Sequence, residues 1–186
     1  MATRRELVER AKDGDHDAFV ALADTAYDRM HRVADLILRD RDLASDAVQE
    51  AIISAWMHVR AIRDPDRFDA WLYRMTIRAS YREARRRSTT VAQVTARQID
   101  IADDVDAVSN VDLRDSLDRG FRRLSPEQRA VLVVHHYLQL ADTEAAAALG
   151  VPVGTMKSRL NRANSALRAA LDADDRLPQV AKEALA

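Results

Sequence analysis

The chain has 186 residues, of which 47% are hydrophobic, so it is long enough to bury a core as one ordinary domain or as two small ones. It contains no cysteine, which excludes disulfides, zinc sites built from thiolates and cysteine nucleophiles. A net charge of −1 argues against tight DNA binding by the whole chain alone, because free-standing DNA-binding domains are usually basic.

The composition favours helices, because only four glycines and four prolines interrupt a sequence rich in Ala, Leu and Arg. Alternating runs of Val, Ile and Thr, which would indicate strands, are missing. The N-terminus leads into a charged amphipathic stretch, and no segment approaches the roughly 20 apolar residues of a membrane span. We therefore expect an all-α, soluble, cytoplasmic protein that does not bind a membrane.

The first zone, from about Asp15 to Arg87, has apolar residues at helical spacing. It breaks at residues 39–42 and again at Pro65, which disfavours a helical conformation at Asp64. Three helices are predicted. Their apolar stripes are Phe19, Leu22, Ala23, Ala26, Met30, Val33, Leu36 and Ile37; Val48, Ala51, Ile52, Ala55 and Trp56; and Trp71, Leu72, Met75, Ile77 and Ala79.

The helical pattern fails in residues 88–112, which carry five Asp against one Arg and no aromatic residue. This composition predicts a flexible acidic linker. We therefore expect two small helical domains, residues 1–87 and 113–171, joined by this linker and followed by a short tail at 172–186.

In the second domain, Ser125-Pro126-Glu127-Gln128 is a strong helix start, with Ser as the N-cap and Gln closing a capping box. The apolar run from Arg129 to Leu138 follows. A short Ala-rich helix from Glu144 to Leu149 ends at Gly150, and a further helix is expected from about Gly154 to Leu171.

Three groups of polar residues could carry function, and the first lies on this last helix. Met156, Leu160 and Ala163 form an apolar stripe on one side. The other side carries donors, namely Lys157, Ser158, Asn161 and Arg162, with Arg159 close by. A helix with an apolar back and a donor-rich front fits the major groove of DNA. An ordinary helical hairpin with a solvated basic face remains an alternative on local pattern alone.

The second group is a run of six arginines in the 14 positions from 74 to 87. Arg74, Arg78 and Arg82 recur every four residues and so share one helix face, with Tyr73 and Tyr81 nearby. A solvated helix end is the alternative, but this density favours nucleic acid.

The third group is Asp46, Gln49 and Glu50, which lie on one helix face. Taken alone it is a polar surface, since no pocket or nucleophile supports acid–base catalysis. The five histidines show no ligand spacing, and no phosphate-binding or catalytic motif is present. We expect no metal, no cofactor and no enzymatic activity.

These motifs together resemble the extracytoplasmic-function (ECF) RNA polymerase sigma factors. Residues 151–163, VPVGTMKSRLNRA, resemble the helix that reads the minus-thirty-five promoter element, and residues 124–132, LSPEQRAVL, the start of sigma region four. Residues 45–56, SDAVQEAIISAW, resemble the polymerase-binding helix of region two, and residues 68–75, FDAWLYRM, the helix that enters its promoter-melting part. The four motifs occur in the family's order and spacing.

The resemblance implies a non-enzymatic protein that binds core RNA polymerase, at its β′ clamp helices and β flap, and directs it to promoter DNA; an anti-sigma factor is a further possible partner. It implies roles for three sets of residues. The polymerase would be bound by Asp46, Gln49 and Glu50. The minus-ten element, with a flipped base held by residues 62–69, would be contacted by Asp64, Arg67, Phe68, Trp71, Arg74, Arg78, Arg82 and Arg85, and the minus-thirty-five element by Thr155, Lys157, Ser158, Arg159, Asn161 and Arg162.

Some residues depart from the family pattern. Arg78 stands where Asn is common, and Arg82 lies where an acid is frequent, which suggests more contact with the DNA backbone. The usual Ser at the start of the hairpin helix is missing, and we expect Asp142 to cap that helix instead. The alternatives are a stand-alone helix-turn-helix regulator and a protein-interaction module of the sigma/anti-sigma type.

Overall fold

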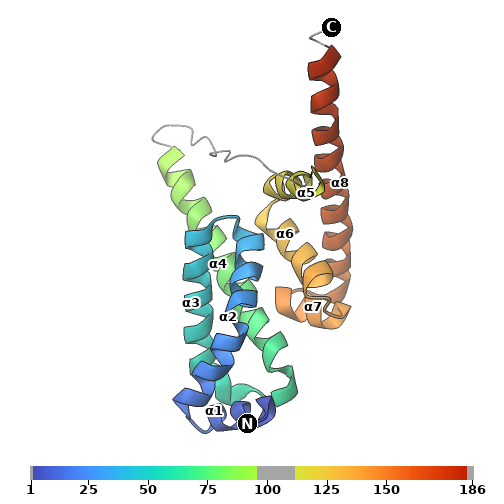
Figure 1. Ribbon diagram of the computed structural model, residues 1–186. Helices are drawn as coiled ribbons and strands as arrows, with labels where there is room; N and C mark the ends of the chain where they lie inside the picture. Colours follow the sequence, from blue (N-terminus) through green and yellow to red (C-terminus); the bar gives the residue numbers. More distant parts are fainter. Residues whose placement is uncertain (1, 96–111, 184–186) are drawn as a thin grey trace.

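The computed structural model describes the backbone of residues 2–95 and 112–183, and the side chains of residues 2–87 and 116–173. Within these ranges every regular element is helical, as the sequence predicts (Figure 1). No helix in the described part of the chain is both long and apolar enough to cross a membrane. The helices form an N-terminal unit, α1–α4, and a C-terminal unit, α5–α8.

The N-terminal unit consists of four helices and two short 3-10 turns: α1 (Arg4–Lys12), α2 (His16–Leu38), α3 (Arg41–His58), η1 (Val59–Ala61), η2 (Pro65–Arg67) and α4 (Phe68–Thr95). The predicted stripe from Phe19 to Met30 is buried throughout. The break between α2 and α3 occurs where the sequence predicts it. There Arg39 adopts φ 58°, and the Asp40 side chain accepts hydrogen bonds from the amides of Asp42 and Leu43.

The C-terminal unit consists of α5 (Asp112–Arg122), α6 (Pro126–Leu132), a π-helical turn η3 (Val133–Tyr137), α7 (Asp142–Leu149) and α8 (Val153–Glu183). The capping box of Ser125 and Gln128 is present at the start of α6, and Gly150 ends α7 in the left-handed conformation at φ 68°. Both predictions are confirmed.

Four local expectations need correction. The run from Arg129 to Leu138 is not one helix, because the π-helical turn follows Leu132 and Gln139 adopts φ 52°. Asp142 does not cap α7; Ala141 holds the N-cap position without a side-chain hydrogen bond, and Asp142 is the first helical residue.

The other two corrections concern helix ends. Helix α4 continues to Thr95, past the expected start of the linker at residue 88, and the linker residues 96–111 lie outside the described residues. Helix α8 continues through the expected tail to Glu183. A helix end predicted from sequence falls where the apolar periodicity stops. Once one end of a helix is packed, adding further turns costs little free energy, so the helix can extend beyond that point.

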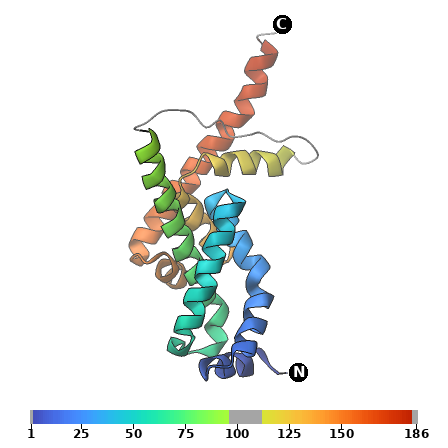
Figure 2. The same cartoon turned by 90° about the vertical axis from the view of Figure 1, so that its left-hand side faces the viewer.

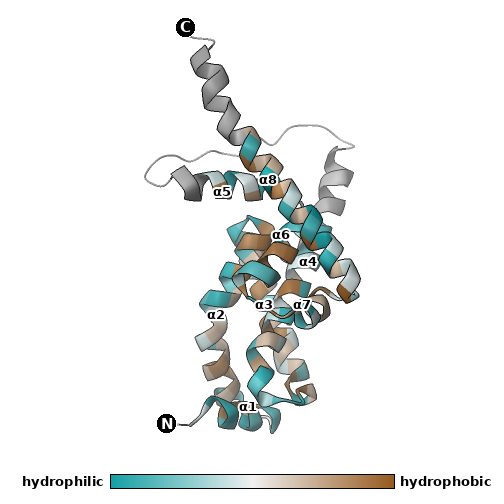
Figure 3. Cartoon of the chain, turned by 90° about the vertical axis from the view of Figure 1, so that its right-hand side faces the viewer, coloured by the Kyte–Doolittle hydropathy of each residue, from teal (hydrophilic) through white to brown (hydrophobic). Residues whose placement is uncertain are grey.

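The two units pack against each other. Helix α4 contacts α2 and α3 on one side and α7 on another, and α6 contacts both α2 and α4. The buried residues of both units form one continuous hydrophobic cluster. Figure 2 shows α1 and the C-terminal end of α8 at opposite ends of the molecule, and Figure 3 shows hydrophobic residues gathered where α6 and α7 lie beside α4.

We predict opposite effects for alanine at two glycines that flank the turn before α8. Neither position has an atom within 4 Å of an added Cβ, so backbone conformation alone decides the outcome. Gly150→Ala places a side chain at φ 68° and should lower the free energy of unfolding by about 1 kcal/mol. Gly154 lies within α8, so Gly154→Ala should leave the free energy of unfolding unchanged or raise it by up to about 1 kcal/mol. Urea unfolding of the two variants measures both; equal effects would contradict this account of the turn.

Candidate functional site

The first half of α8 presents the polar face that the sequence predicts. Met156 and Ala163 are fully buried, whereas Lys157, Ser158, Asn161 and Arg162 are exposed. This helix therefore packs its apolar stripe against the rest of the C-terminal unit and exposes its hydrogen-bond donors to solvent. These are the two properties that insertion into the major groove requires.

The exposed donors of α8 are partly oriented by local hydrogen bonds. The Ser158 hydroxyl donates to the Thr155 carbonyl at 2.9 Å, and Arg162 Nε donates to the Ser158 carbonyl at 3.3 Å. Lys157 Nζ lies 3.0 Å from an oxygen of Asp142 on α7, so the residue expected to cap α7 instead ties α7 to α8.

Arg159 differs from Arg162, because it is half-buried and turned toward the N-terminal unit. It lines a groove of about 400 Å³ together with Tyr81 and Arg85 of α4 and Glu127 of α6. Burial raises the pKa of Tyr81 to about 12, and the nearby Arg159 opposes that rise. Of these two arginines, Arg162 is therefore the one that is open to solvent.

The arginine face of α4 is divided among three environments. Arg78 and Arg85 are exposed near its middle, and Arg74 is half-buried in a groove against α7. On the opposite edge, Arg82 Nε lies 2.9 Å from an oxygen of Glu50, and Arg86 Nη1 lies 3.7 Å from the other oxygen of the same carboxylate. The sequence pattern predicts one stripe, but the packing of α4 between two neighbours separates its members.

The turn before α4 is held by its own side chains. Asp64 accepts a hydrogen bond from the Asp66 amide at 3.1 Å, Pro65 is buried, and Arg67 donates to Glu144 of α7 at 2.7 Å. Phe68 is only 1% exposed and lies 6.0 Å from the Trp71 ring. The expected DNA contact of Phe68 therefore does not fit this arrangement, since its side chain supports the turn from beneath and presents no surface.

Two arginines of α1 brace this turn, and sequence reasoning missed both. Arg5 Nη1 lies 2.8 Å from Asp66, Arg4 forms an ion pair with Asp69, and the Arg4 guanidinium lies 5.8 Å from the centre of the Phe68 ring. The paired residues are more than 60 positions apart in the chain, so no local pattern could reveal them.

The acidic face of α3 continues into an apolar one. Asp46 and Gln49 are exposed, whereas Glu50 is half-buried by its two arginines, so the acidic patch is less open than the sequence suggests. On the same side of α3, Ile53 is 55% and Met57 is 73% exposed. We call Asp46, Gln49, Glu50, Ile53 and Met57 the α3 face. Large apolar side chains left open at helical spacing indicate a protein-binding surface.

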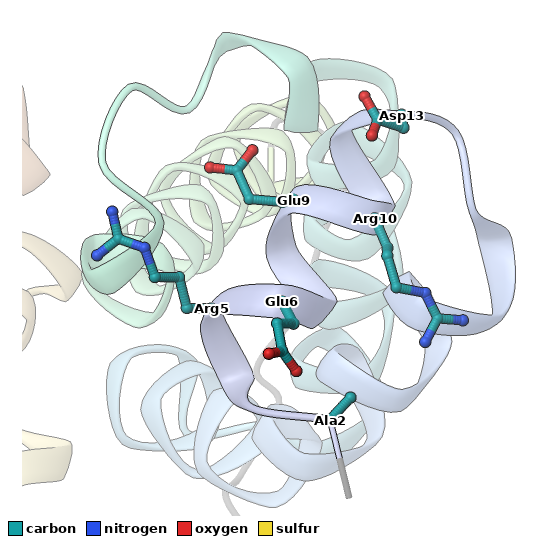
Figure 4. A pocket seen from close by; sticks show the side chains of 6 residues that line it. All are labelled: Ala2, Arg5, Glu6, Glu9, Arg10 and Asp13. Carbon is teal, nitrogen blue, oxygen red and sulfur yellow. The ribbon is translucent and has the colours of Figure 1, made fainter.

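A hollow over α1 is a further candidate for a binding site. It covers about 530 Å³ over α1 and is lined by residues 2, 5, 6, 9, 10 and 13 (Figure 4). Three of its charged groups already have partners: Arg5 pairs with Asp66, Arg10 with Asp15, and Glu9 with Lys12. We therefore do not assign a ligand site there.

We predict that Arg4→Gln combined with Arg5→Gln loosens the turn without unfolding the unit. Exposed ion pairs contribute about 0–1 kcal/mol each, so global stability should fall only slightly. Amides of residues 62–69 should exchange with solvent faster in hydrogen-exchange mass spectrometry. Arg10→Gln, which breaks an ion pair of the same helix away from the turn, is the matched control. Equal exchange in both variants would contradict the bracing role.

Two family models match the chain: sigma-70 region 2 over residues 22–90 and sigma-70 region 4 over residues 114–167. The ECF RNA polymerase sigma factor SigM of Mycobacterium tuberculosis is 32% identical, over 87% of this chain and 81% of that protein. The ECF RNA polymerase sigma-E factor of Escherichia coli is 31% identical, over 89% and 92%.

Solved structures agree with the sequence matches. The sigma factor RpoE of Bartonella quintana, in complex with the anti-sigma factor NepR, has a TM-score of 0.65 at 25% identity, covering 84% of this chain and 98% of that one. CnrH in complex with the cytosolic domain of CnrY has a TM-score of 0.62 at 26% identity, covering 91% and 97%. With both sigma regions present in order and relatives aligned over most of its length, the chain belongs to the ECF group of sigma-70 RNA polymerase sigma factors.

Proposed function

We propose that this sigma factor binds core RNA polymerase through the α3 face and reads promoters with α4 and α8. The observation that carries the proposal is the first half of α8, where a buried apolar stripe lies beneath exposed Lys157, Ser158, Asn161 and Arg162. The protein catalyses nothing itself and works in the cytoplasm, where polymerase and promoters are found.

For the minus-thirty-five element, Arg162 is our candidate for base contact. A guanidinium can donate two hydrogen bonds to a guanine edge in the major groove. Arg162 is exposed and shares a face with Ser158 and Asn161. Thr155, Lys157 and Arg159 lie at the edges of this surface, where contacts to phosphate position the helix without reading sequence.

For the minus-ten element, the exposed Arg78 and Arg85 lie at the centre of the proposed surface, with Trp71 and Arg74 toward the turn. Residues 62–69 would hold a base flipped out of the strand, with Asp64 and Arg67 at the rim. Unstacking a base costs a few kcal/mol, which contacts to the turn and to polymerase would offset. Arg82, bound to Glu50, lies between this surface and the α3 face.

For the polymerase, the α3 face combines carboxylates with exposed apolar side chains. Such a mixture suits a stable protein contact, because buried apolar groups supply affinity while charges supply orientation and rate. We assign this face to the β′ clamp helices and the C-terminal unit to the β flap. In this proposal residues 1–87 bind core polymerase and the minus-ten element, residues 113–171 bind the minus-thirty-five element, and residues 88–112 connect the two. An anti-sigma factor is a further candidate partner.

Run-off transcription with core polymerase tests the proposal as a whole. Core polymerase alone should give no specific transcript, and addition of this protein should give one from a cognate promoter. Tight, sequence-specific binding of duplex promoter DNA by the isolated chain, with no effect on polymerase, would instead indicate a stand-alone regulator.

We predict that Asp46→Arg, and separately Met57→Ala, weakens binding to core polymerase by about tenfold or more. This equals about 1.4 kcal/mol, a loss typical of the few dominant residues near the centre of an interface. Because both side chains are exposed, the melting temperature should change little. Asp24→Arg on the exposed side of α2 makes the same charge change away from the α3 face and is the control. Unchanged affinity in a pull-down for both α3 variants would refute the assignment.

We predict that Arg162→Ala costs about 1–3 kcal/mol of promoter discrimination and relaxes preference at one or two base pairs. Arg159→Ala should weaken all sequences alike if that residue contacts only phosphate. Arg168→Ala, an exposed arginine later on α8, serves as the control. The readout is transcription from a library randomised at the upstream element. Wild-type activity and preference in both Arg159→Ala and Arg162→Ala would show that α8 does not read the promoter.

A further inference from the structure

The turn of residues 62–69, which the proposed function assigns to the flipped base, packs few of its own side chains. Ile62, Pro65 and Phe68 are buried, and its other side chains are wholly or partly exposed. A turn with so few buried residues keeps much backbone freedom unless further contacts restrict it. A base pocket made by such a turn loses affinity in proportion to the time that the turn spends in other shapes.

Helix α1 supplies contacts that restrict this turn. Arg5 Nη1 lies 2.8 Å from a carboxylate oxygen of Asp66, and Arg4 forms an ion pair with Asp69. The Arg4 guanidinium also lies 5.8 Å from the centre of the Phe68 ring. The two arginines therefore hold the second half of the turn at three successive points.

Helix α1 is anchored independently of the turn. A capping box closes its first turn, and Val8 and Ala11 are fully buried where α1 packs on α2. At its other end Arg10 Nη2 lies 2.7 Å from an oxygen of Asp15, the residue that caps α2. Figure 1 shows α1 lying across the end of the α2–α4 bundle at which the turn is found. Contacts made by α1 can therefore hold the turn in one shape.

The same ion pairs also change the charge of the turn. Asp64, Asp66 and Asp69 place three carboxylates in a surface that would meet DNA phosphates, and Arg4 and Arg5 neutralise two of them. Neutralisation is thus the competing explanation for these pairs. It differs from positioning because charge acts on the phosphates and does not depend on the base.

We propose that Arg4 and Arg5 are positioning residues for base capture: by holding Asp69 and Asp66 they keep the turn, before DNA arrives, in the shape that accepts the flipped minus-ten base. Such preorganisation raises affinity without any new contact to the DNA. Both arginines precede residue 22, where the match to sigma-70 region 2 begins. The inference rests on the proposed function of the turn, and it adds α1 to the elements that determine minus-ten preference.

The test measures binding of single-stranded DNA by this protein assembled with core polymerase. One probe is a fluorescent oligonucleotide that carries the non-template minus-ten strand of a promoter giving a run-off transcript. The other probes carry one abasic site each, at successive positions of the same strand. The position where the abasic site weakens wild-type binding most, by about fivefold or more, identifies the captured base.

Arg4→Gln combined with Arg5→Gln should weaken binding of the intact oligonucleotide about three- to tenfold, because two exposed ion pairs shift the population of the turn by about this factor. Binding of the oligonucleotide that lacks the captured base should stay within about twofold of the wild-type value, since that strand gains nothing from the shape of the turn.

Arg10→Gln is the matched control, because it removes an arginine of α1 whose partner Asp15 lies outside the turn, and it should leave both affinities unchanged. Figure 4 shows Arg5 and Arg10 extending from different sides of α1. Melting temperatures verify that every variant is folded.

A second variant separates positioning from neutralisation. Asp66→Asn combined with Asp69→Asn breaks the same two ion pairs, but it removes negative charge from the turn where the arginine variant removes positive charge. Positioning predicts weaker binding of the intact oligonucleotide in both variants. Neutralisation predicts weaker binding in the arginine variant and tighter binding in the aspartate variant, for intact and abasic strands alike.

Each remaining outcome overturns a distinct claim. Opposite effects in the two variants, or equal weakening of intact and abasic strands, overturn positioning in favour of neutralisation. Wild-type affinities in the arginine variant overturn any role of α1. A wild-type protein that transcribes but shows no abasic penalty overturns base capture, and the inference with it. A wild-type protein that starts no specific transcript with core polymerase overturns the proposed function itself, which the other outcomes leave standing.

Discussion

Helix α4 has to bury more than one side, and the arrangement of the candidate site depends on this constraint. Ile77 and Ala79 are fully buried in it, as are the polar residues Thr76 and Ser80. Those two hydroxyls donate to the carbonyls of Leu72 and Thr76, at 3.1 and 2.9 Å, so the helix satisfies them within itself. Because these hydroxyls are paired, their burial costs little, and α4 can pack on more than one side while its arginines at positions 78, 82, 85, 86 and 87 stay exposed.

The same constraint explains why the arginines of α4 have different surroundings despite their regular spacing. Each step of four residues rotates the side chain by a small angle, which is enough to move it from one flanking helix to the other. Arg82 therefore meets Glu50 of α3, whereas Arg74 meets the groove against α7. A sequence-based list treats these residues as equivalent, but the packing makes them different in charge environment and in access to a ligand.

Ion pairs between the two units and around the turn before α4 are individually weak, because their side chains remain partly exposed to solvent. The pair of Arg67 and Glu144 is partly exposed to solvent, with side chains 67% and 34% accessible. Such a pair contributes little to stability, but it determines which surface meets which. The apolar contacts beneath, including the buried Val131, Val134 and Ala146, hold each helix in place. The ion pairs thus orient the helices relative to one another, whereas the apolar contacts stabilise them.

Much of the fold could be predicted from local sequence. The stripe from Phe19 to Met30, the capping box at Ser125 and the left-handed Gly150 are all confirmed. These features depend on helical periodicity and on hydrogen bonds within a few residues, and both are encoded locally. The helix ends at Thr95 and Glu183 could not be predicted, because the apolar pattern stops before both ends and α8 continues through Pro178, a residue type that normally interrupts a helix.

The sequence by itself determined the helical class, the capping box at Ser125, the exposed polar face of α8 and the acidic residues of α3. Tertiary structure alone decided that Phe68 is buried, that Arg4 and Arg5 brace the turn before α4, and that Glu144 reaches Arg67. The physical reason is the range of the interactions. Backbone hydrogen bonds within helices and turns join residues only a few positions apart, whereas these contacts join residues more than 60 positions apart, which only the packing of whole helices brings together.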